Sequence, residues 1–204
     1  MKSKFKNLII LALVAVFLLS TIYYLLSTIY AATNIDSVYR YAWNDVIGWI
    51  DFAYSVGNVN VYSNRLEGYA SSSVGYIALN CNSTPNGDIC SGPSGNWKIS
   101  NNGSGYLSGW AYNDAIGWIS FDRVTAGSSY TYQVVIDSVS GYFSGWAWNE
   151  NVGWISFNCN QSEIGNTCAP PEGPGSSTYK VKTNWNAVPI SGNLTSSVFD
   201  SMAT

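Results

Sequence analysis

Histidine is absent from this sequence, and charged residues make up only 10% of its 204 positions. The lack of histidine removes the commonest general base and the commonest metal ligand of proteins, so a Ser–His–Asp triad and His-based zinc sites are excluded. The sequence also has no glycine-rich phosphate loop and no Gly-x-Ser-x-Gly nucleophile motif. We therefore expect no catalytic residues, no cofactor and no metal, which means that the protein is not an enzyme.

Positive charge is scarce beyond the N-terminal segment. Of the nine Lys and Arg residues, three precede residue 32, whereas all twelve Asp and Glu residues follow it. Without that segment, six basic and twelve acidic residues remain, and the net charge is −6. Such a chain lacks the basic surface that binds nucleic acid and is not attracted to anionic membranes. We expect no nucleic-acid partner, and contact with a membrane only through the N-terminal segment.

Residues 1–32 have the pattern of an export signal. Three lysines open the segment, Leu8–Tyr30 contains no charge over 23 residues, and the small residues Ala31 and Ala32 follow. This order is typical of a secretory signal peptide, but the apolar run is also long enough to span a bilayer as a helix. A cleaved signal peptide and an N-terminal membrane anchor both fit. Either one makes the remainder extracellular or places it at the cell surface.

Aromatic residues, by contrast, are abundant: nine Trp, fifteen Tyr and seven Phe. They recur in four copies of the pattern aromatic-Ala-x-x-x-x-(Val/Ile)-Gly-(Trp/Tyr)-Ile-x-(Phe/Leu), of which the second is one residue shorter in the middle. The copies are Tyr41–Phe52, Gly68–Leu79, Gly109–Phe121 and Gly145–Phe157. Two aromatic, β-branched runs that flank an Asn-Asp, Asn-Glu or Ser-Ser turn are typical of a β-hairpin. We predict an all-β fold of tandem Trp-rich β-hairpin repeats, arranged as a sandwich, barrel or solenoid after an N-terminal hydrophobic helix.

The packing faces of these hairpins depend on their register. A four-residue turn in the third copy would place Trp118 over Gly109 and Ala111, which pairs large side chains with small ones. We favour this register, although a slip of one residue would reverse the faces. In the favoured register, the apolar face consists of Trp110, Tyr112, Ile119 and Phe121.

The four cysteines indicate a second level of organisation. Cys81 and Cys90 are nine residues apart, as are Cys159 and Cys168, and the two pairs follow copies two and four. In an exported chain this predicts two loop-closing disulfides, each stabilising the fold by about 2–3 kcal/mol. A zinc site is disfavoured because C-x2-C spacing is missing. The predicted units are repeat pairs at 33–100 and 101–168, which share one fold or form two small domains.

The remaining segments are assigned by composition. Additional strands are predicted before most copies, at 59–62, 97–99 and 133–136. A Pro/Gly-rich linker is predicted at 169–178. Residues 179–204 begin with a similar strand and are predicted to be an incomplete β unit or the start of a further domain.

The segment Ser144–Phe157, SGWAWNENVGWISF, resembles a repeat of exported, largely uncharacterised bacterial tandem-repeat proteins. The resemblance covers residues 38–168 and implies a secreted or surface repeat protein, without an established activity to carry over. The Gly-(Trp/Tyr)-Ile ending is also weakly similar to WG-type repeats.

The aromatic residues are the candidate ligand contacts. Rows of Trp and Tyr can stack on sugar rings, but the same residues can equally be the core of the repeat. Trp97 and Trp185 lie outside the hairpin pattern and are therefore the better candidates for exposed contact residues. The full candidate set is Trp97, Trp110, Trp118, Trp146, Trp154 and Trp185.

The acids at equivalent turn positions, Asp45, Asp114 and Glu150, fit turn chemistry better than catalysis. A hydrolase acting through acids alone would need two facing carboxylates, and calcium is conceivable at oxygen-rich turns. The sequence thus predicts a secreted or cell-surface structural or adhesive protein. The alternative is a carbohydrate-binding module. Its partner would be a surface polysaccharide or another cell-surface protein.

Overall fold

The structure is a computed structural model that describes residues 14, 16–17, 33–160 and 178–185. Val14, Val16 and Phe17 are helical, and the other residues of the predicted signal peptide or anchor lie outside these ranges. So do most of the predicted linker and residues 186–204. In the described part, no helix has the length and apolarity needed to span a membrane. Met1–Ala32 and Thr33–Thr204 are separate compact units, and the strands found in the described residues lie in the second unit.

Within the described residues of the second unit, the regular secondary structure is β apart from one short helix. Its four main hairpins are named hairpins 1 to 4: β1 (Ile35–Asn44) with β2 (Gly48–Asp51), β5 (Tyr69–Ser72) with β6 (Gly75–Ala78), β8 (Leu107–Asn113) with β9 (Gly117–Ser120), and β11 (Phe143–Asn149) with β12 (Gly153–Ser156). The other elements are β3 (Asn60–Val61), β4 (Leu66–Glu67), β7 (Ile99–Asn101), the short helix α2 (Arg123–Ala126), β10 (Val134–Ile136) and β13 (Val181–Thr183).

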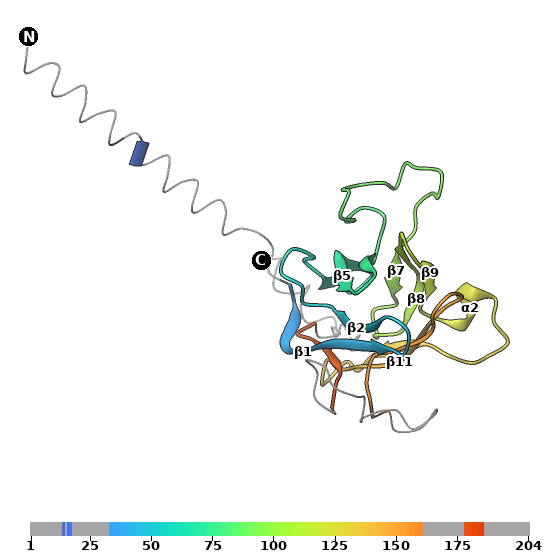
Figure 1. Cartoon of the computed structure of the whole chain (residues 1–204). Helices are drawn as coiled ribbons and strands as arrows, with labels where there is room; N and C mark the ends of the chain where they lie inside the picture. Colours follow the sequence, from blue (N-terminus) through green and yellow to red (C-terminus); the bar gives the residue numbers. More distant parts are fainter. Residues whose placement is uncertain (1–13, 15, 18–32, 161–177, 186–204) are drawn as a thin grey trace, which may run out of the picture. The chain divides into compact units, whose positions relative to one another are not determined.

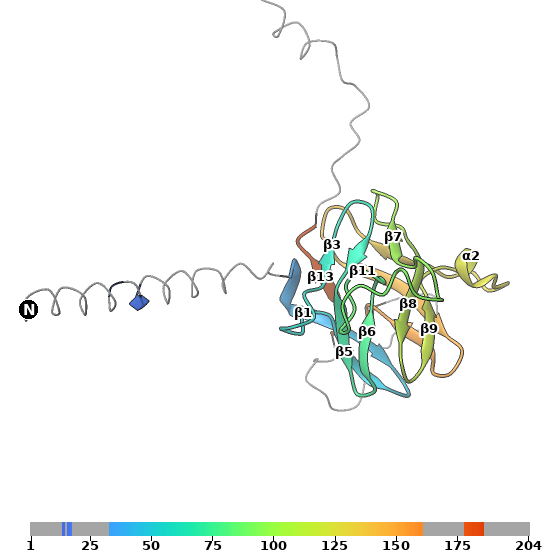
Figure 2. The same ribbon diagram turned by 90° about the horizontal axis from the view of Figure 1, so that it is seen from above.

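The four hairpins close into one eight-stranded antiparallel barrel. Each hairpin pairs with the next, through β2 and β5, β6 and β8, and β9 and β11. The ring closes because β12 pairs with β1. Figure 1 shows the hairpins, and Figure 2 shows β5, β6, β8 and β9 side by side. Residues from both predicted repeat pairs therefore share a single barrel.

The inner face of the barrel carries the smallest and the branched residues of each hairpin. Every hairpin places an alanine directly opposite an isoleucine, and all eight side chains are at most 3% exposed. An eight-stranded barrel has an interior just wide enough for side chains, so alanine opposite isoleucine suits closure. The pairs are Ala42–Ile50, Ala70–Ile77, Ala111–Ile119 and Ala147–Ile155. The same core contains Phe52, Leu79, Phe121 and Phe157.

The favoured register is wrong by one residue. Trp118 lies opposite Tyr112 rather than over Ala111, and it shares the outer face of the barrel with Tyr112 and Trp110. Only Ile119 and Phe121 of the predicted apolar face point inward. The Trp and Tyr rings of the four hairpins would overfill so narrow an interior, so they pack outside, whereas the alanine, isoleucine and phenylalanine side chains lie inside.

The turn length explains the register. Asn113 pairs with Gly117, which leaves three residues in the turn instead of four. Gly117 has a φ of 78°, the left-handed conformation that follows a type I turn in three-residue hairpin loops. In hairpin 2, Ser72 pairs with Gly75 around a shorter turn. The turn absorbs the missing residue, so the alanine–isoleucine pairing is preserved.

A polar side chain at each turn ties neighbouring hairpins together, and in hairpins 1, 3 and 4 it is a buried asparagine. Asn149 Nδ2 donates to the carbonyl oxygens of Ile116 and Trp118 in hairpin 3, at 2.9 Å and 2.8 Å. Its Oδ1 accepts from the backbone N–H of Val152 in its own turn, at 3.0 Å. These bonds join the turns in a ring around the barrel. The corresponding side chains in the other hairpins are Asn44, Asn113 and Ser73.

Short strands that come before a hairpin in the repeat, here called leading strands, link successive hairpins at the end of the barrel opposite the hairpin turns. β7 pairs with β8 and β10 with β11, as predicted, and each also bridges back to the end of the preceding hairpin. β13 pairs with β1, and Lys180 beside it bridges to Asn158 after hairpin 4. Tyr179–Lys182, the expected start of a fifth unit, therefore connects hairpin 4 to hairpin 1.

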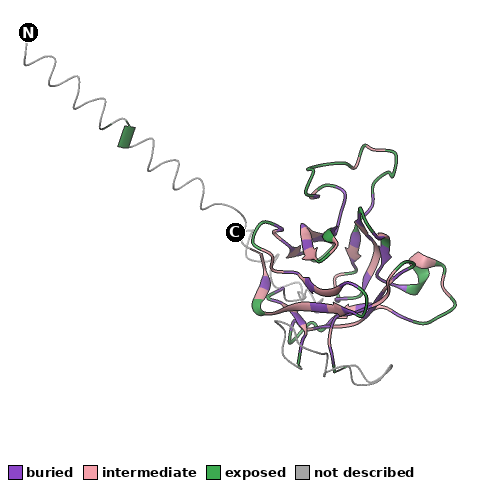
Figure 3. Ribbon diagram, in the orientation of Figure 1, coloured by how far each residue is buried: buried purple, intermediate pink, exposed green. Residues whose placement is uncertain are grey.

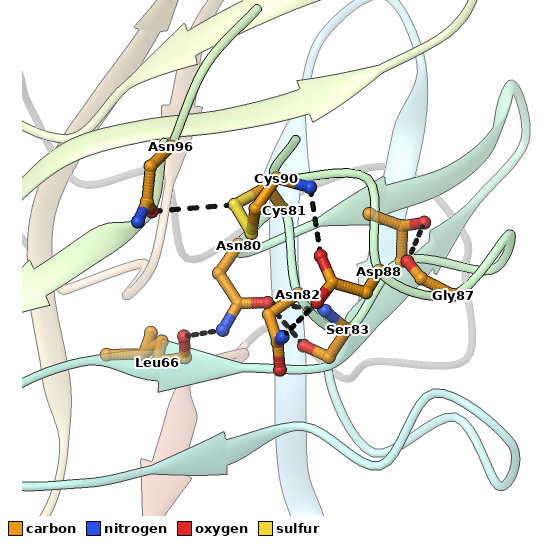
Figure 4. Close-up of a disulfide and its surroundings, with 10 residues drawn as sticks. Leu66, Asn80, Cys81, Asn82, Ser83, Gly87, Asp88, Cys90 and Asn96 are labelled. Atoms are coloured by element: carbon orange, nitrogen blue, oxygen red, sulfur yellow. Dashed lines mark hydrogen bonds between the residues drawn. A yellow bond between two sulfur atoms is a disulfide. The ribbon is translucent and has the colours of Figure 1, made fainter. Parts of the chain in front are cut away.

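Cys81 and Cys90 form a disulfide in the long loop between β6 and β7. Figure 4 shows this loop, in which Asn82 Nδ2 also donates to Asp88 at 2.8 Å. Much of the loop is exposed (Figure 3), so the disulfide restrains a segment that has few core contacts. Cys159 is disulfide-bonded as well, and Cys168 lies outside the described residues.

Candidate functional site

The outer face of every hairpin carries a cluster of aromatic rings. In each cluster two rings from the paired strands meet edge to face or tilted, with centroids 4.6–5.1 Å apart. Such pairs stabilise by about 0.5–1.5 kcal/mol beyond their area burial. The pairs are Trp43–Trp49, Tyr69–Tyr76, Tyr112–Trp118 and Trp148–Trp154.

A further ring from outside the hairpin packs on each cluster, at 5.0–5.7 Å from the second-strand ring. On hairpins 1, 3 and 4 this ring lies two residues before a leading strand. The aromatic clusters therefore hold the leading segments against the barrel wall, which is a structural role. The packing rings for hairpins 1 to 4 are Tyr179, Tyr54, Trp97 and Tyr132.

The exposure of the predicted contact residues varies widely. Trp118 is 37% exposed, Trp110 and Trp154 are half-buried, and Trp146 is only 9% exposed. The prediction that Trp97 and Trp185 are the exposed rings is wrong, because they are 6% and 8% exposed. Trp97 packs beneath Trp118, and Trp185 joins the main core cluster. Trp97 and Trp185 lie outside the hairpin pattern because they belong to the leading segments, and not because they are exposed.

A groove of about 320 Å³, named groove A, lies on the outer wall between hairpins 3 and 4. Trp118 and Trp110 from hairpin 3 and Trp148 from hairpin 4 supply its aromatic surface. Its polar groups come from Glu150 and Asn151 at the turn of hairpin 4, and from two serines. Its size lies at the lower end of ordinary small-molecule sites. The groove therefore combines apolar ring surface with hydrogen-bonding groups.

A second groove of about 300 Å³, named groove B, lies between hairpins 2 and 3. Its rings are Tyr76, which is 40% exposed, and Tyr112. Its acid is Asp114, at the turn of hairpin 3. The loop next to the Cys81–Cys90 disulfide supplies the remaining wall, including Asn86 and Ile89.

The turn acids divide into two kinds. Asp45 accepts a hydrogen bond from Trp43 Nε1 at 2.9 Å. Within the described residues, the carboxylates of Asp114 and Glu150 have neither a hydrogen-bond nor an ion-pair partner. No three acidic or cysteine side chains of the described ranges gather as metal ligands. Asp114 and Glu150 thus present free oxygen acceptors to grooves B and A.

A buried hydroxyl pair lies behind groove A. The Tyr132 hydroxyl is 2.5 Å from Ser120 Oγ, and Ser120 lines the groove. Burial raises the pKa of Tyr132 above its ordinary value, so the phenol stays neutral across physiological pH. This pair fixes the back wall of the groove as an uncharged, hydrogen-bonding surface.

The residues predicted from the sequence include Trp110 and Trp118 of groove A but not Trp148 or the two tyrosines of groove B. Glu150 and Asp114 are among the predicted turn acids, which the sequence assigned to turn chemistry. The alternation of Trp146-Ala147-Trp148 would have indicated Trp148, because it places this residue on the same face as the candidate Trp146. Comparison of the chain with protein-family models, with curated proteins and with solved structures finds no match.

Proposed function

We propose that the protein is a secreted or cell-surface adhesive protein without catalytic activity, in which tandem hairpin repeats form the barrel and its aromatic outer wall makes the contacts. The observation that carries this proposal is groove A, where Trp118 stands 37% exposed beside Trp148 and a partnerless Glu150. Export follows from the N-terminal pattern, with the hydrophobic helix either removed or retained as an anchor. The partner lies outside the cell, as a surface polysaccharide or another surface protein.

The repetition supports a scaffold role. All four hairpins share the alanine–isoleucine pairing, and three share the turn asparagine that bonds the neighbouring hairpin. Antiparallel barrel closure removes the exposed strand edges that promote aggregation. A non-catalytic role is supported by the lack of histidine and by acids that stand singly at turns.

Carbohydrate binding is the second candidate, and groove A favours it specifically. Pyranose rings offer an apolar face to an aromatic ring, while their hydroxyls need acceptors and donors at the rim. Glu150 is such an acceptor, and Asn151 lies beside it with its Nδ2 bonded to Ile116 O at 2.9 Å. A mixed site of this kind fits a sugar better than a purely apolar ligand.

The test is binding of the full chain to a panel of soluble and insoluble polysaccharides, with intrinsic Trp fluorescence as the readout. We expect a saturable spectral shift with at least one polymer, reversed by free oligosaccharide. Trp148→Ala should weaken this binding at least tenfold. Trp43→Ala is the matched control, because Trp43 occupies the same register position with its own partner ring at 4.6 Å.

Three results would count against carbohydrate binding at groove A: no shift with any polymer, equal loss in both variants, or unchanged binding in Trp148→Ala. The first would leave a protein partner as the target of adhesion. The second would assign the rings a structural role only, and the third would remove groove A as the contact site.

A further inference from the structure

Grooves A and B occupy equivalent positions on the barrel. Each lies between the second strand of one hairpin and the first strand and turn of the next. The residues correspond position by position when the two hairpins are aligned by their alanine–isoleucine pairs. The corresponding pairs, the groove A residue first, are Trp118 and Tyr76, Trp148 and Tyr112, Glu150 and Asp114, Ile116 and Val74, and Gly117 and Gly75.

The two grooves share hairpin 3 as a common wall. Trp118 lines groove A and Tyr112 lines groove B, and their ring centroids are only 4.9 Å apart. A ligand chain that leaves one groove therefore reaches the other across a single aromatic pair. The grooves differ in strength, because groove A offers three Trp rings where groove B offers two Tyr rings.

The charge of the grooves selects among glycans. No Lys or Arg is among the residues that line either groove, and each groove contains one partnerless carboxylate. A uronic acid, sialic acid or sulfate group would meet a like charge with no cation to offset it, and like-charge contacts suppress wrong partners. Neutral hydroxyls, by contrast, can donate to Glu150 and Asp114.

We infer that grooves A and B are two subsites of one binding surface that holds a single chain of a neutral polysaccharide across hairpin 3. This inference rests on the proposed carbohydrate binding and adds the ligand class and the number of subsites. A chain long enough to reach both subsites gains affinity because its second contact is intramolecular. A short chain occupies groove A alone.

The experiment is isothermal titration of the full chain with neutral gluco-, manno- and N-acetylglucosamine oligosaccharides, each as a disaccharide and as a hexasaccharide. Oligogalacturonides of the same lengths are the anionic control. We expect the hexasaccharide of one neutral series to bind at least tenfold more tightly than its disaccharide, with one oligosaccharide per protein. The anionic series should bind at least tenfold more weakly.

Variants of groove B separate the inference from the proposed function. Tyr76→Ala and Asp114→Asn should each lower hexasaccharide affinity about tenfold toward the disaccharide value and leave disaccharide affinity unchanged. Asp114 is an exposed turn side chain without a partner in the described residues, so Asp114→Asn keeps the test valid if Tyr76→Ala destabilises the fold. Trp43→Ala should change neither affinity.

Each other outcome overturns a defined claim. If the affinity does not rise with oligosaccharide length, or does not fall in either groove B variant, there is no second subsite, but carbohydrate binding at groove A stands. Preference for the anionic series overturns the neutral class. Failure of every oligosaccharide and polymer to bind removes carbohydrate binding itself.

Discussion

The inner and outer faces of the same hairpins differ in almost every respect. Inside, alanine and isoleucine face each other at no more than 3% exposure. Outside, the aromatic rings range from 9% exposure at Trp146 to 40% at Tyr76. The most conspicuous residues of the repeat are thus not its core, and the least conspicuous residue, alanine, lies deepest. The interior determines whether the barrel closes, whereas the outer wall holds the leading segments and leaves grooves open to a ligand.

The strongest test of this difference truncates one inner ring. Phe157 is 1% exposed and contacts Phe52, Phe121 and Phe143. Phe157→Ala should lower the free energy of unfolding by about 3–5 kcal/mol, because it leaves a cavity that the barrel cannot fill. Urea unfolding followed by far-UV circular dichroism would measure the loss. A loss below about 1 kcal/mol would contradict the inner-core assignment.

The turn ring is the next largest contributor. Asn149→Ala should cost about 2–3 kcal/mol, since it removes the side-chain hydrogen bonds to the Trp118 carbonyl of hairpin 3 and to the Val152 N–H of hairpin 4. The Ile116 carbonyl keeps its bond from Asn151 Nδ2. Asp114→Ala, one hairpin away on the solvent side of its turn, is the control and should change the unfolding free energy by less than about 0.5 kcal/mol. Equal effects of the two substitutions would show that the turns are not coupled.

The sequence predicted the β class, the hairpins and strands that overlap β3, β7, β10 and β13, because hydrophobic spacing and turn residues are local signals. It left barrel, sandwich and solenoid open, since closure depends on β1 pairing with β12, more than a hundred positions along the chain. The register was wrong because alternation alone does not reveal whether a turn has three or four residues. Trp97 and Trp185 were misplaced because their burial comes from distant hairpins.

The outer rings should contribute less to stability than the inner ones. Trp43→Ala and Trp148→Ala each remove one ring of a half-buried pair, and we expect each to cost about 1–2 kcal/mol. Thermal and urea melts of both variants would measure this. If the two variants lose similar stability but only Trp148→Ala loses glycan affinity, the structural role of the outer rings is separated from their role in binding a ligand. A loss of stability as large as that of Phe157→Ala would contradict the difference between the inner and outer faces.

The smallest effect is expected from a solvent-exposed turn outside the barrel wall. Backbone N–H donation from Ser140, its hydroxyl and the N–H of Val139 lower the pKa of Asp137 below its ordinary value of 3.8. Because the folded pKa is depressed, this stabilisation is present above pH 3.8 and is lost as pH falls through the lower folded value. Melting temperatures of the wild type and Asp137→Asn should converge at acid pH. A difference in melting temperature that grows at acid pH would contradict the lowered pKa of Asp137.

The central claim is that the outer aromatic wall is open to solvent and ligand while the rings beneath it are closed. Fluorine NMR of the full chain labelled with 5-fluorotryptophan, assigned by Trp→Phe variants, tests it ring by ring. In deuterated solvent, Trp118 should show the large isotope shift of an exposed indole, and Trp97 and Trp185 should show little. Addition of the best neutral hexasaccharide should move the resonances of Trp118 and Trp148 and leave that of Trp43 in place. Uniform protection of all indoles, or equal movement of Trp43 and Trp148, would contradict the account.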